Sequence, residues 1–241
     1  KAGVIYEWAP GLTSSFTFQQ GYRAGGSTGT LEGGLTEFDP EFTNNYEIAL
    51  RGEFLDGALV ANANAFYTKW NDQQVLRPGP FGIDTIIENA GESRLWGGEF
   101  AVNYFPTDDL QLFGSFGYAN TEYLDYVNAD EVFTGNEFPQ APNFTGAFGG
   151  IYNFYDGWAV GIDASYTSKA FSDPENTLET QSDDRFLLNA QVTYETDLFL
   201  AGVYVRNLLD NDYAELRFGS NPVQVRPGEP FIIGAFAQFT F

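Results

Sequence analysis

The side chains available for chemistry in this 241-residue chain are its carboxylates, its few arginines and its tyrosines, because histidine and cysteine are both absent. Without histidine the chain has no Ser-His-Asp triad, no imidazole base and no common transition-metal ligand. Without cysteine it has no thiol nucleophile, disulfide or zinc cluster. Paired carboxylates could still act as general acids and bases, so catalysis is disfavoured rather than excluded. We assign no catalytic residue, no metal site and no cofactor.

Charged and amide side chains recur at alternate positions of several segments, where they would line one face of a strand. On that face they are candidates to contact a neighbouring domain or a passing ligand, while solvated or mutually paired charges are the favoured interpretation. These polar candidates are Arg23, Glu47, Arg51, Glu53, Asn62, Asn64, Glu99, Asp163, Glu195 and Arg206.

Two further groups lie in connections between such segments. Asp173, Glu175, Glu179, Asp183 and Asp184 crowd one connection and could bind a divalent cation through oxygen atoms. They lack calcium-loop spacing, so a solvated acidic loop is the favoured interpretation. The second group is aromatic and consists of Tyr123, Tyr126, Phe133 and Phe138. These rings could stack on a ligand, although packing against neighbouring loops explains their presence about as well.

The elements that position these residues are strands, because apolar and polar residues alternate along most of the chain. The last segment is the clearest: Phe231, Ile233, Ala235, Ala237 and Phe239 occupy one face, and the chain closes on an aromatic residue, Phe241. Counted in this way, the pattern predicts about eleven strands.

The connections between the predicted strands alternate between short turns and long polar loops. The long ones span residues 24–43, 75–89, 125–140, 172–184 and 216–229. Soluble sandwiches mix their loop lengths, whereas outer-membrane barrels place short turns on one side and long loops on the other. The polar face is rich in Asn, Gln, Ser, Thr and Gly, as in a wet lumen, and the apolar face carries aromatic residues toward strand ends. We therefore predict an all-β, antiparallel transmembrane barrel wall.

An odd number of strands leaves this wall open. The first and last strands would run in the same direction and could not pair with each other in an antiparallel barrel. If the missing part also has eleven strands, the barrel would have about 22, the size associated with transporters that have a plugged lumen. No signal peptide opens the chain, so we expect either a cytoplasmic protein or a piece of a longer one, and the barrel pattern favours the second.

Several short motifs occur in order along nearly the whole chain. They are Gly21-Tyr-Arg-Ala-Gly-Gly26, Tyr46-Glu-Ile-Ala-Leu-Arg51, Ala65-Phe-Tyr67, Glu88-Asn-Ala-Gly91 with Gly97-Gly-Glu99, Asn207-Leu-Leu-Asp210 with Tyr213, and the final Phe241. Together they resemble the C-terminal half of the barrel of TonB-dependent outer-membrane receptors. Leu209 stands where that family usually has an aromatic residue, and Phe231 replaces the arginine that often follows the proline before the last strand.

The resemblance implies a receptor in the bacterial outer membrane that captures a scarce nutrient, most often a ferric siderophore, or else haem, cobalamin or a glycan. The TonB energy-transducing complex would act on a plug domain, which residues 1–241 do not include, as they also lack the first part of the barrel. The implied partners are membrane lipid and lipopolysaccharide, the rest of the barrel with its plug, the TonB complex and a small-molecule ligand.

Other classes fit less well. The charge disfavours nucleic acid as a partner, because the formal net charge is −22 and only 11 lysines and arginines are present, scattered along the chain. A soluble eleven-stranded can like the fluorescent proteins would need a Tyr-Gly pair, and no tyrosine here precedes glycine. A passive porin would need a complete, unplugged barrel, and the outer-membrane barrel hydrolases rely on histidine. The porin and the soluble can remain as alternatives.

Overall fold

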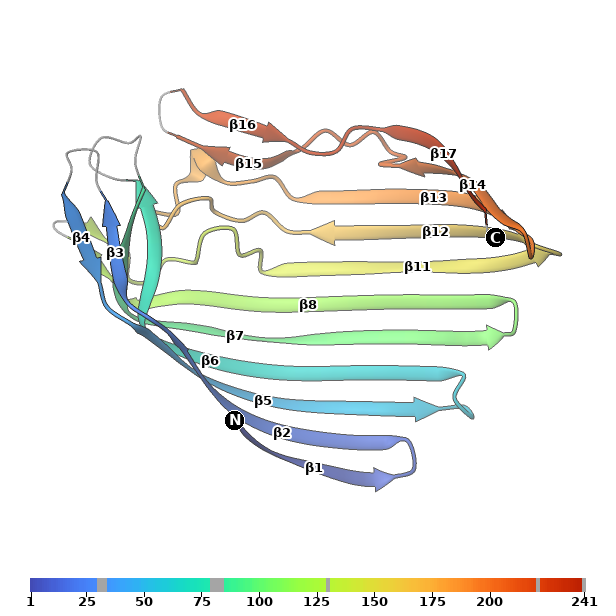
Figure 1. Ribbon diagram of the computed structural model, residues 1–241, viewed down its shortest axis with the longest axis horizontal. Coiled ribbons are helices and arrows are strands. Elements are labelled where there is room, and N and C mark those ends of the chain that lie inside the picture. Colours follow the sequence, from blue (N-terminus) through green and yellow to red (C-terminus); the bar gives the residue numbers. More distant parts are fainter. Residues whose placement is uncertain (30–33, 79–84, 129–130, 220–221, 240–241) are drawn as a thin grey trace.

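The wall of the protein is one antiparallel sheet of 11 strands (Figure 1). The computed structural model describes residues 1–29, 34–78, 85–128, 131–219 and 222–239. The strands follow one another in chain order across the sheet, so each lies beside its sequence neighbour in the wall. They are β1 (Ala2–Ala9), β2 (Leu12–Arg23), β5 (Glu41–Phe54), β6 (Leu59–Pro78), β7 (Thr85–Thr107), β8 (Leu110–Asp125), β11 (Phe144–Tyr155), β12 (Trp158–Thr167), β13 (Arg185–Glu195), β14 (Phe199–Arg206) and β17 (Ile232–Phe239).

Short turns join the strands at one end of the wall, on the right in Figure 1, and long connections join them at the other. The turn residues suit left-handed backbone: Gly11 has φ +78° and Gly157 has φ +72°. A Cβ at Gly157 would also lie 2.3 Å from the Glu195 carbonyl oxygen, so only glycine fits that turn. The predicted alternation of short and long connections is confirmed.

The long connections contain more structure than the sequence pattern predicted. Residues 75–89 were predicted as a loop, but β6 continues to Pro78 and β7 begins at Thr85, and this prediction was wrong for most of the segment. The other long connections hold β3 (Gly26–Gly29), β4 (Leu35–Phe38), β9 (Val127–Asn128), β10 (Glu131–Val132), the short 3₁₀ turn η1 (Leu178–Thr180), β15 (Ala214–Phe218) and β16 (Gln224–Pro227).

The wall is open. Because every neighbouring pair is antiparallel, the edge strands β1 and β17 run in the same direction, and they do not pair with each other in the described residues. The predicted partial barrel with parallel edges is therefore confirmed, whereas the closing aromatic Phe241 lies outside the described residues.

The wall has no dry centre. Its large apolar side chains are exposed on one face, as with Trp8 at 64%, Phe148 at 63% and Phe239 at 64% exposure. The main buried apolar cluster lies instead beyond the wall, among the extensions of β6, β7 and β8 and the connection that follows β8. Among the described residues, no helix is long and apolar enough to cross a membrane.

Candidate functional site

The polar candidates from the sequence all share one face of the wall. Strand register places Arg51 opposite Thr13 and Asn62, and Asn64 opposite Glu99. The Asn64 amide donates to Glu99 Oε2 at 3.2 Å, and the Glu99 backbone N–H donates to Asn64 Oδ1 at 3.0 Å. Five of the candidates line one shallow depression on this inner face: Glu47, Arg51, Asn62, Asn64 and Glu99.

The remaining candidates are spread along the same face. Asp163 accepts a hydrogen bond of 2.8 Å from Asn189, and it lines a second depression together with Arg206. Arg23 lies near the long-loop end of β2, whereas Glu53 and Glu195 lie near the short turns. The structure therefore groups Glu47, Arg51, Asn62, Asn64 and Glu99 in one place and Asp163 with Arg206 in another.

The opposite face carries two rows of aromatic residues. Phe18, Tyr46, Tyr67 and Trp96 are register partners across four successive strands near the long-loop end. Near the short turns, Trp158 packs on Tyr194 with ring centroids 4.9 Å apart, and Tyr194 on Phe199 at 5.9 Å. Two aromatic rows separated by small and aliphatic residues are typical of the two interfaces of a membrane.

A polar row lies just beyond the first aromatic row on this outward face. We call it the outward belt; it consists of Gln20, Asn44, Lys69, Arg94 and Glu122, which are register partners from β2 to β8. The Lys69 ammonium lies 2.8 Å from Glu92, and Arg94 lies 2.5 Å from Glu122. This row marks the height at which the wall leaves its apolar band.

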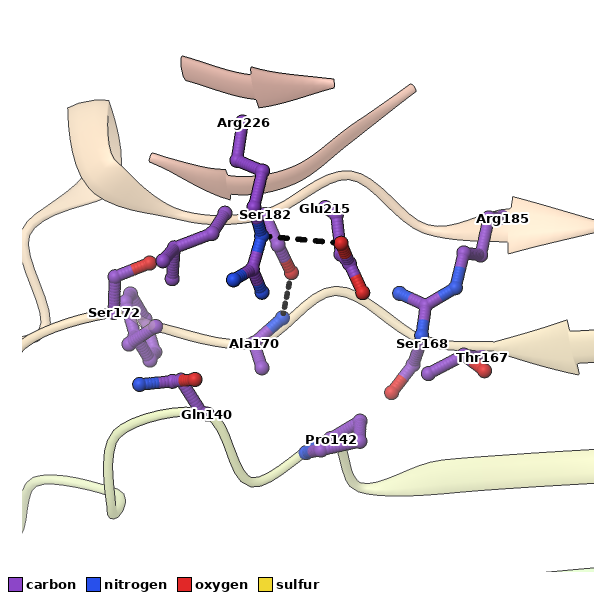
Figure 2. Close-up of a pocket in the computed structure, with 12 residues that line it drawn as sticks. Gln140, Pro142, Thr167, Ser168, Ala170, Ser172, Ser182, Arg185, Glu215 and Arg226 are labelled. Carbon is purple, nitrogen blue, oxygen red and sulfur yellow. Dashed lines mark hydrogen bonds and ion pairs between the residues drawn. The ribbon is translucent and has the colours of Figure 1, made fainter. Parts of the chain in front are cut away.

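At the loop end, a cavity of about 140 Å³ lies between the ends of the wall and the β15–β16 hairpin (Figure 2). Arg226 enters it from the hairpin, Arg185 from the start of β13, and Gln140 from the connection after β8. Ser168 and Ser182 also line it, as do Thr167, Ser172 and Glu215. The sequence patterns did not identify these residues, because they lie in or next to three separate connections that no strand periodicity links.

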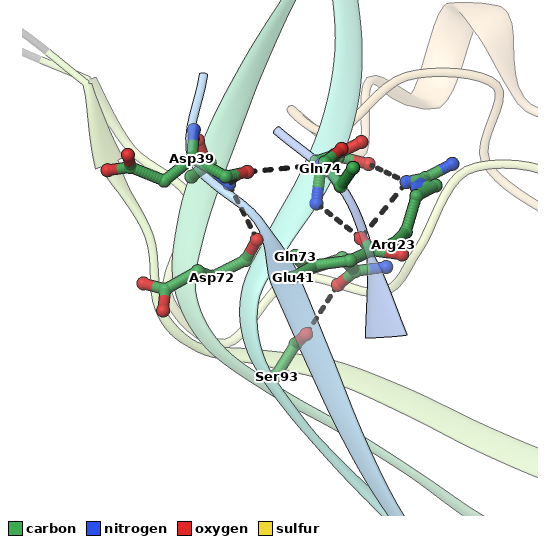
Figure 3. A network of polar contacts seen from close by, with 9 residues as sticks. Arg23, Asp39, Glu41, Asp72, Gln73, Gln74 and Ser93 are labelled. Carbon is green, nitrogen blue, oxygen red and sulfur yellow. Dashed lines mark hydrogen bonds and ion pairs between the residues drawn. The ribbon is translucent and has the colours of Figure 1, made fainter. Parts of the chain in front are cut away.

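A polar network holds the loop bases of β2, β5, β6 and β7 together (Figure 3). Arg23 donates to Glu41 Oε2 at 3.0 Å, and the Gln74 backbone N–H donates to the same oxygen at 2.7 Å. Asn89 donates to the carbonyl oxygens of Asp39 at 3.0 Å and Asp72 at 2.7 Å. Arg23, a polar candidate, is therefore engaged in holding these loop bases.

The structure brings the four loop aromatics together but buries them. Tyr123, Tyr126, Phe133 and Phe138 are between 1% and 9% exposed. The Tyr123 ring lies 5.0 Å from Tyr126 and 4.8 Å from Phe138 between centroids, and Tyr126 lies 4.7 Å from Phe133. Because these rings pack on one another, the structure favours the packing interpretation over stacking on a ligand.

Two carboxylates of the acidic connection, Asp173 and Asp183, bind other groups of the chain. Asp173 accepts from the Thr177 backbone N–H at 2.9 Å, and Asp183 accepts from the Ala214 backbone N–H and from Arg217, both at 2.8 Å. The Arg217 guanidinium holds the pKa of the Asp183 carboxyl below its usual range, helped by the Ala214 N–H and opposed by partial burial. The described residues contain no cluster of three or more carboxylates placed to hold a metal ion.

The family assignment follows from comparison with known proteins. The family described as TonB dependent receptor-like, beta-barrel, matches residues 1–208. The chain belongs to this family. The resemblance predicted from the motifs is thus confirmed, as is the outer-membrane location typical of the family. The family and the curated relatives are transport receptors rather than enzymes.

Among curated proteins, the metal-pseudopaline receptor of Pseudomonas aeruginosa is 29% identical over 95% of this chain and 32% of its own length. A probable TonB-dependent siderophore receptor of Acinetobacter baumannii is 25% identical over 82% of this chain and 27% of its own. The chain therefore spans about a third of the length of the first of these relatives.

Among solved structures, the ferric yersiniabactin uptake receptor of Yersinia pestis aligns with a TM-score of 0.82 and 20% identity, over 99% of this chain and 36% of its own. A copper transporter aligns with a TM-score of 0.78 and 18% identity, over 99% and 39%. These likenesses show the TonB-receptor barrel fold.

The motif residues of this family member hold its loops in place. Asn207, which is 1% exposed, donates to the carbonyl oxygens of Asn211 at 3.0 Å and Glu229 at 2.9 Å. The Tyr213 hydroxyl accepts from the Glu229 backbone N–H at 3.1 Å. In the Glu88–Gly91 motif, Asn89 holds a loop base in the same way, through its hydrogen bonds to the carbonyl oxygens of Asp39 and Asp72. These motifs fix the bases of long loops, so they identify the fold rather than the ligand.

Proposed function

We propose that this chain is the C-terminal part of the barrel of an outer-membrane receptor that takes up a scarce metal as a small-molecule chelate, a ferric siderophore or a related metallophore. The observation that carries the proposal is the open wall, with a wet polar inner face and an apolar outer face, in a family of energised receptors. The curated relatives named for a metal-pseudopaline complex and for siderophores support a metal chelate as cargo.

The rest of the receptor would supply the missing strands and the plug. An odd number of further strands is needed to close the wall, and eleven more would give a barrel of about 22. The inner-face residues Glu47, Arg51 and Glu53 form no ion pair or side-chain hydrogen bond within the described part of the chain. They are therefore proposed to contact the plug or the water around it, and the TonB complex would act on that plug.

The outer face would contact lipid, and the outward belt would contact lipopolysaccharide. Lys69 and Arg94 are register partners directly above the row that holds Tyr67 and Trp96, at the height expected for lipid phosphates. Glu92 and Glu122 pair with them, and divalent cations between these carboxylates and lipid phosphates would add to the contact.

Growth on defined metal sources tests the proposal. A strain in which the full-length gene is deleted should lose growth on one metal chelate in metal-limited medium, and the gene on a plasmid should restore it. A strain lacking the TonB complex should show the same loss even with the gene present. Undiminished growth on every siderophore or metallophore chelate tested, under metal limitation, would contradict the proposal.

A further inference from the structure

The cavity beneath the β15–β16 hairpin differs in charge from the rest of the molecule. The chain carries a net charge of −22, yet the charged groups that line the cavity are Arg185, Arg226 and one carboxylate, Glu215. The Arg226 Nε donates to Glu215 at 3.1 Å, so this carboxylate already has a cation beside it. One arginine charge is left over in the cavity.

That charge belongs to Arg185. Its guanidinium lies over the Tyr213 ring, 5.6 Å from the centroid, and makes no ion pair or side-chain hydrogen bond with any residue the structure describes. A cation–π contact with an aromatic face holds a guanidinium in place while leaving its N–H groups free to donate. Arg185 thus presents free N–H donors to the cavity (Figure 2).

Two buried hydroxyls add to the donors. Ser168 and Ser182 are 9% and 8% exposed. The Ser168 Oγ accepts from the Phe144 backbone N–H at 3.1 Å, and the Ser182 Oγ accepts from the Ala170 backbone N–H at 3.0 Å. Neither hydroxyl donates to a described residue, so both protons remain available to an acceptor in the cavity. The Gln140 side chain, which also lines the cavity, makes no hydrogen bond with the described residues.

We infer that this cavity binds an oxyanion, the carboxylate group of an anionic metal chelate, with Arg185 as the charged contact and Ser168, Ser182 and Gln140 as neutral donors. A guanidinium fork matches a carboxylate in two parallel hydrogen bonds. A cavity of 140 Å³ accommodates one such group and leaves the rest of the chelate at the barrel mouth. The inference rests on the proposed function and specifies the ligand chemistry at this point of the mouth.

Binding of citrate to the purified full-length receptor tests the inference. Calorimetry should detect citrate binding to the wild-type receptor, and Arg185→Gln should weaken it by about 10- to 100-fold, as expected for loss of a charge-assisted hydrogen bond. Arg185→Lys keeps the charge but loses the planar fork, so its affinity should fall between the two. Heat-modifiable gel migration checks that each variant is folded.

Lys169→Gln is the matched control, because Lys169 is exposed, lies next to Ser168, and does not line the cavity. It removes the same charge and should leave citrate binding within about twofold. If Lys169→Gln weakens binding as much as Arg185→Gln, the effect is general electrostatics and the inference is overturned. It is also overturned if Arg185→Gln binds like the wild type, or if the wild type binds no citrate at about 10 mM.

Inorganic phosphate and lipopolysaccharide micelles distinguish the possible sources of the oxyanion. If Arg185→Gln weakens the binding of citrate, whether or not it also weakens the binding of phosphate, the result supports a small-molecule ligand. If Arg185→Gln weakens the binding of lipopolysaccharide alone, the inference is overturned in favour of a lipid site. The growth assay above reports separately on the proposed function. Normal metal-chelate uptake together with citrate binding that ignores Arg185 would reject the cavity assignment alone.

Discussion

At the residue scale, a single buried amide, that of Asn207, holds the base of one long loop in place. Asn207 has a positive φ of 47°, which asparagine tolerates better than most residues. Its side chain also accepts from the Asn211 backbone N–H at 2.9 Å, so three hydrogen bonds meet at one buried amide. The Asn207-Leu-Leu-Asp210 motif is thereby explained without reference to any ligand.

We expect Asn207→Ala to destabilise the receptor by about 2–3 kcal/mol, because it leaves backbone groups of Asn211 and Glu229 without partners. The urea midpoint for loss of the heat-modifiable form would measure this. Asn153→Ala is the control, since Asn153 is exposed and its side chain makes no hydrogen bond with the described residues. Equal midpoints for the two variants would show that the Asn207 bonds contribute little.

The Asp183–Arg217 contact predicts a pH-dependent anchoring of the β15–β16 hairpin. Since the folded-state pKa of Asp183 is lowered, its stabilising contribution is fully present above the ordinary aspartate pKa of about 4 and is lost as pH falls through the lowered value. The Ala214 amide donates to Asp183, so its hydrogen exchange should report more frequent opening of the hairpin contact only as the pH falls below the ordinary aspartate pKa. In Asp183→Asn, opening should be greater at neutral pH and show no such inflection; an inflection in that variant would assign it to another group.

At the element scale, the sequence predicted the wall strands well because each separates two different solvents. Ala63 and Ala65 face outward while Asn62 and Asn64 face inward, and that contrast persists wherever lipid covers one side. Beyond the apolar band the contrast between a lipid-facing and a water-facing side disappears. There the side chains of Gln74 and Asn89 donate to backbone carbonyl oxygens, and Val75 and Ala90 pack in the buried apolar cluster of the loop end. The alternation no longer marks a face there, so the extension of β6 and β7 was predicted as a loop.

The residues of the candidate site also divide into those that the sequence could predict and those that it could not. Inner-face residues such as Glu99 and Asp163 could be placed from periodicity, because a residue's face in a strand follows from its number. The cavity around Arg185 could not, since its lining depends on how three separate connections fold against one another. For the same reason, the sequence left open whether Tyr123 packs against neighbouring loops or stacks on a ligand.

A matched pair of substitutions tests the assignment of the faces. Ala65→Arg places a charge in the lipid-facing band and should destabilise the barrel by about 2–4 kcal/mol. Asn64→Arg places the same charge one residue away on the wet face, near Glu99, and should cost less than about 1 kcal/mol. Urea midpoints of the full-length receptor in lipid vesicles would compare them. Equal destabilisation by both would mean that the inner face is not hydrated.

At the scale of the whole molecule, the parallel edges of the wall determine how it can be completed. Each edge of a sheet in lipid exposes a row of backbone N–H and C=O groups that lipid cannot satisfy. β1 and β17 run in the same direction, so they cannot satisfy each other by an antiparallel seam. A two-fold pair of these chains about the barrel axis would meet the same parallel seam, so self-association does not solve the problem.

Residues 1–241 produced alone should therefore fail to form a barrel that resists SDS without heating. Adding the remaining part of the receptor as a second polypeptide should restore the heat-modifiable form, because an odd number of further strands gives both β1 and β17 an antiparallel neighbour. Gel migration with and without boiling, after refolding into detergent, distinguishes the two mixtures. A heat-modifiable monomer from residues 1–241 alone would require β1 and β17 to pair in parallel, and the need for a complement would then be refuted.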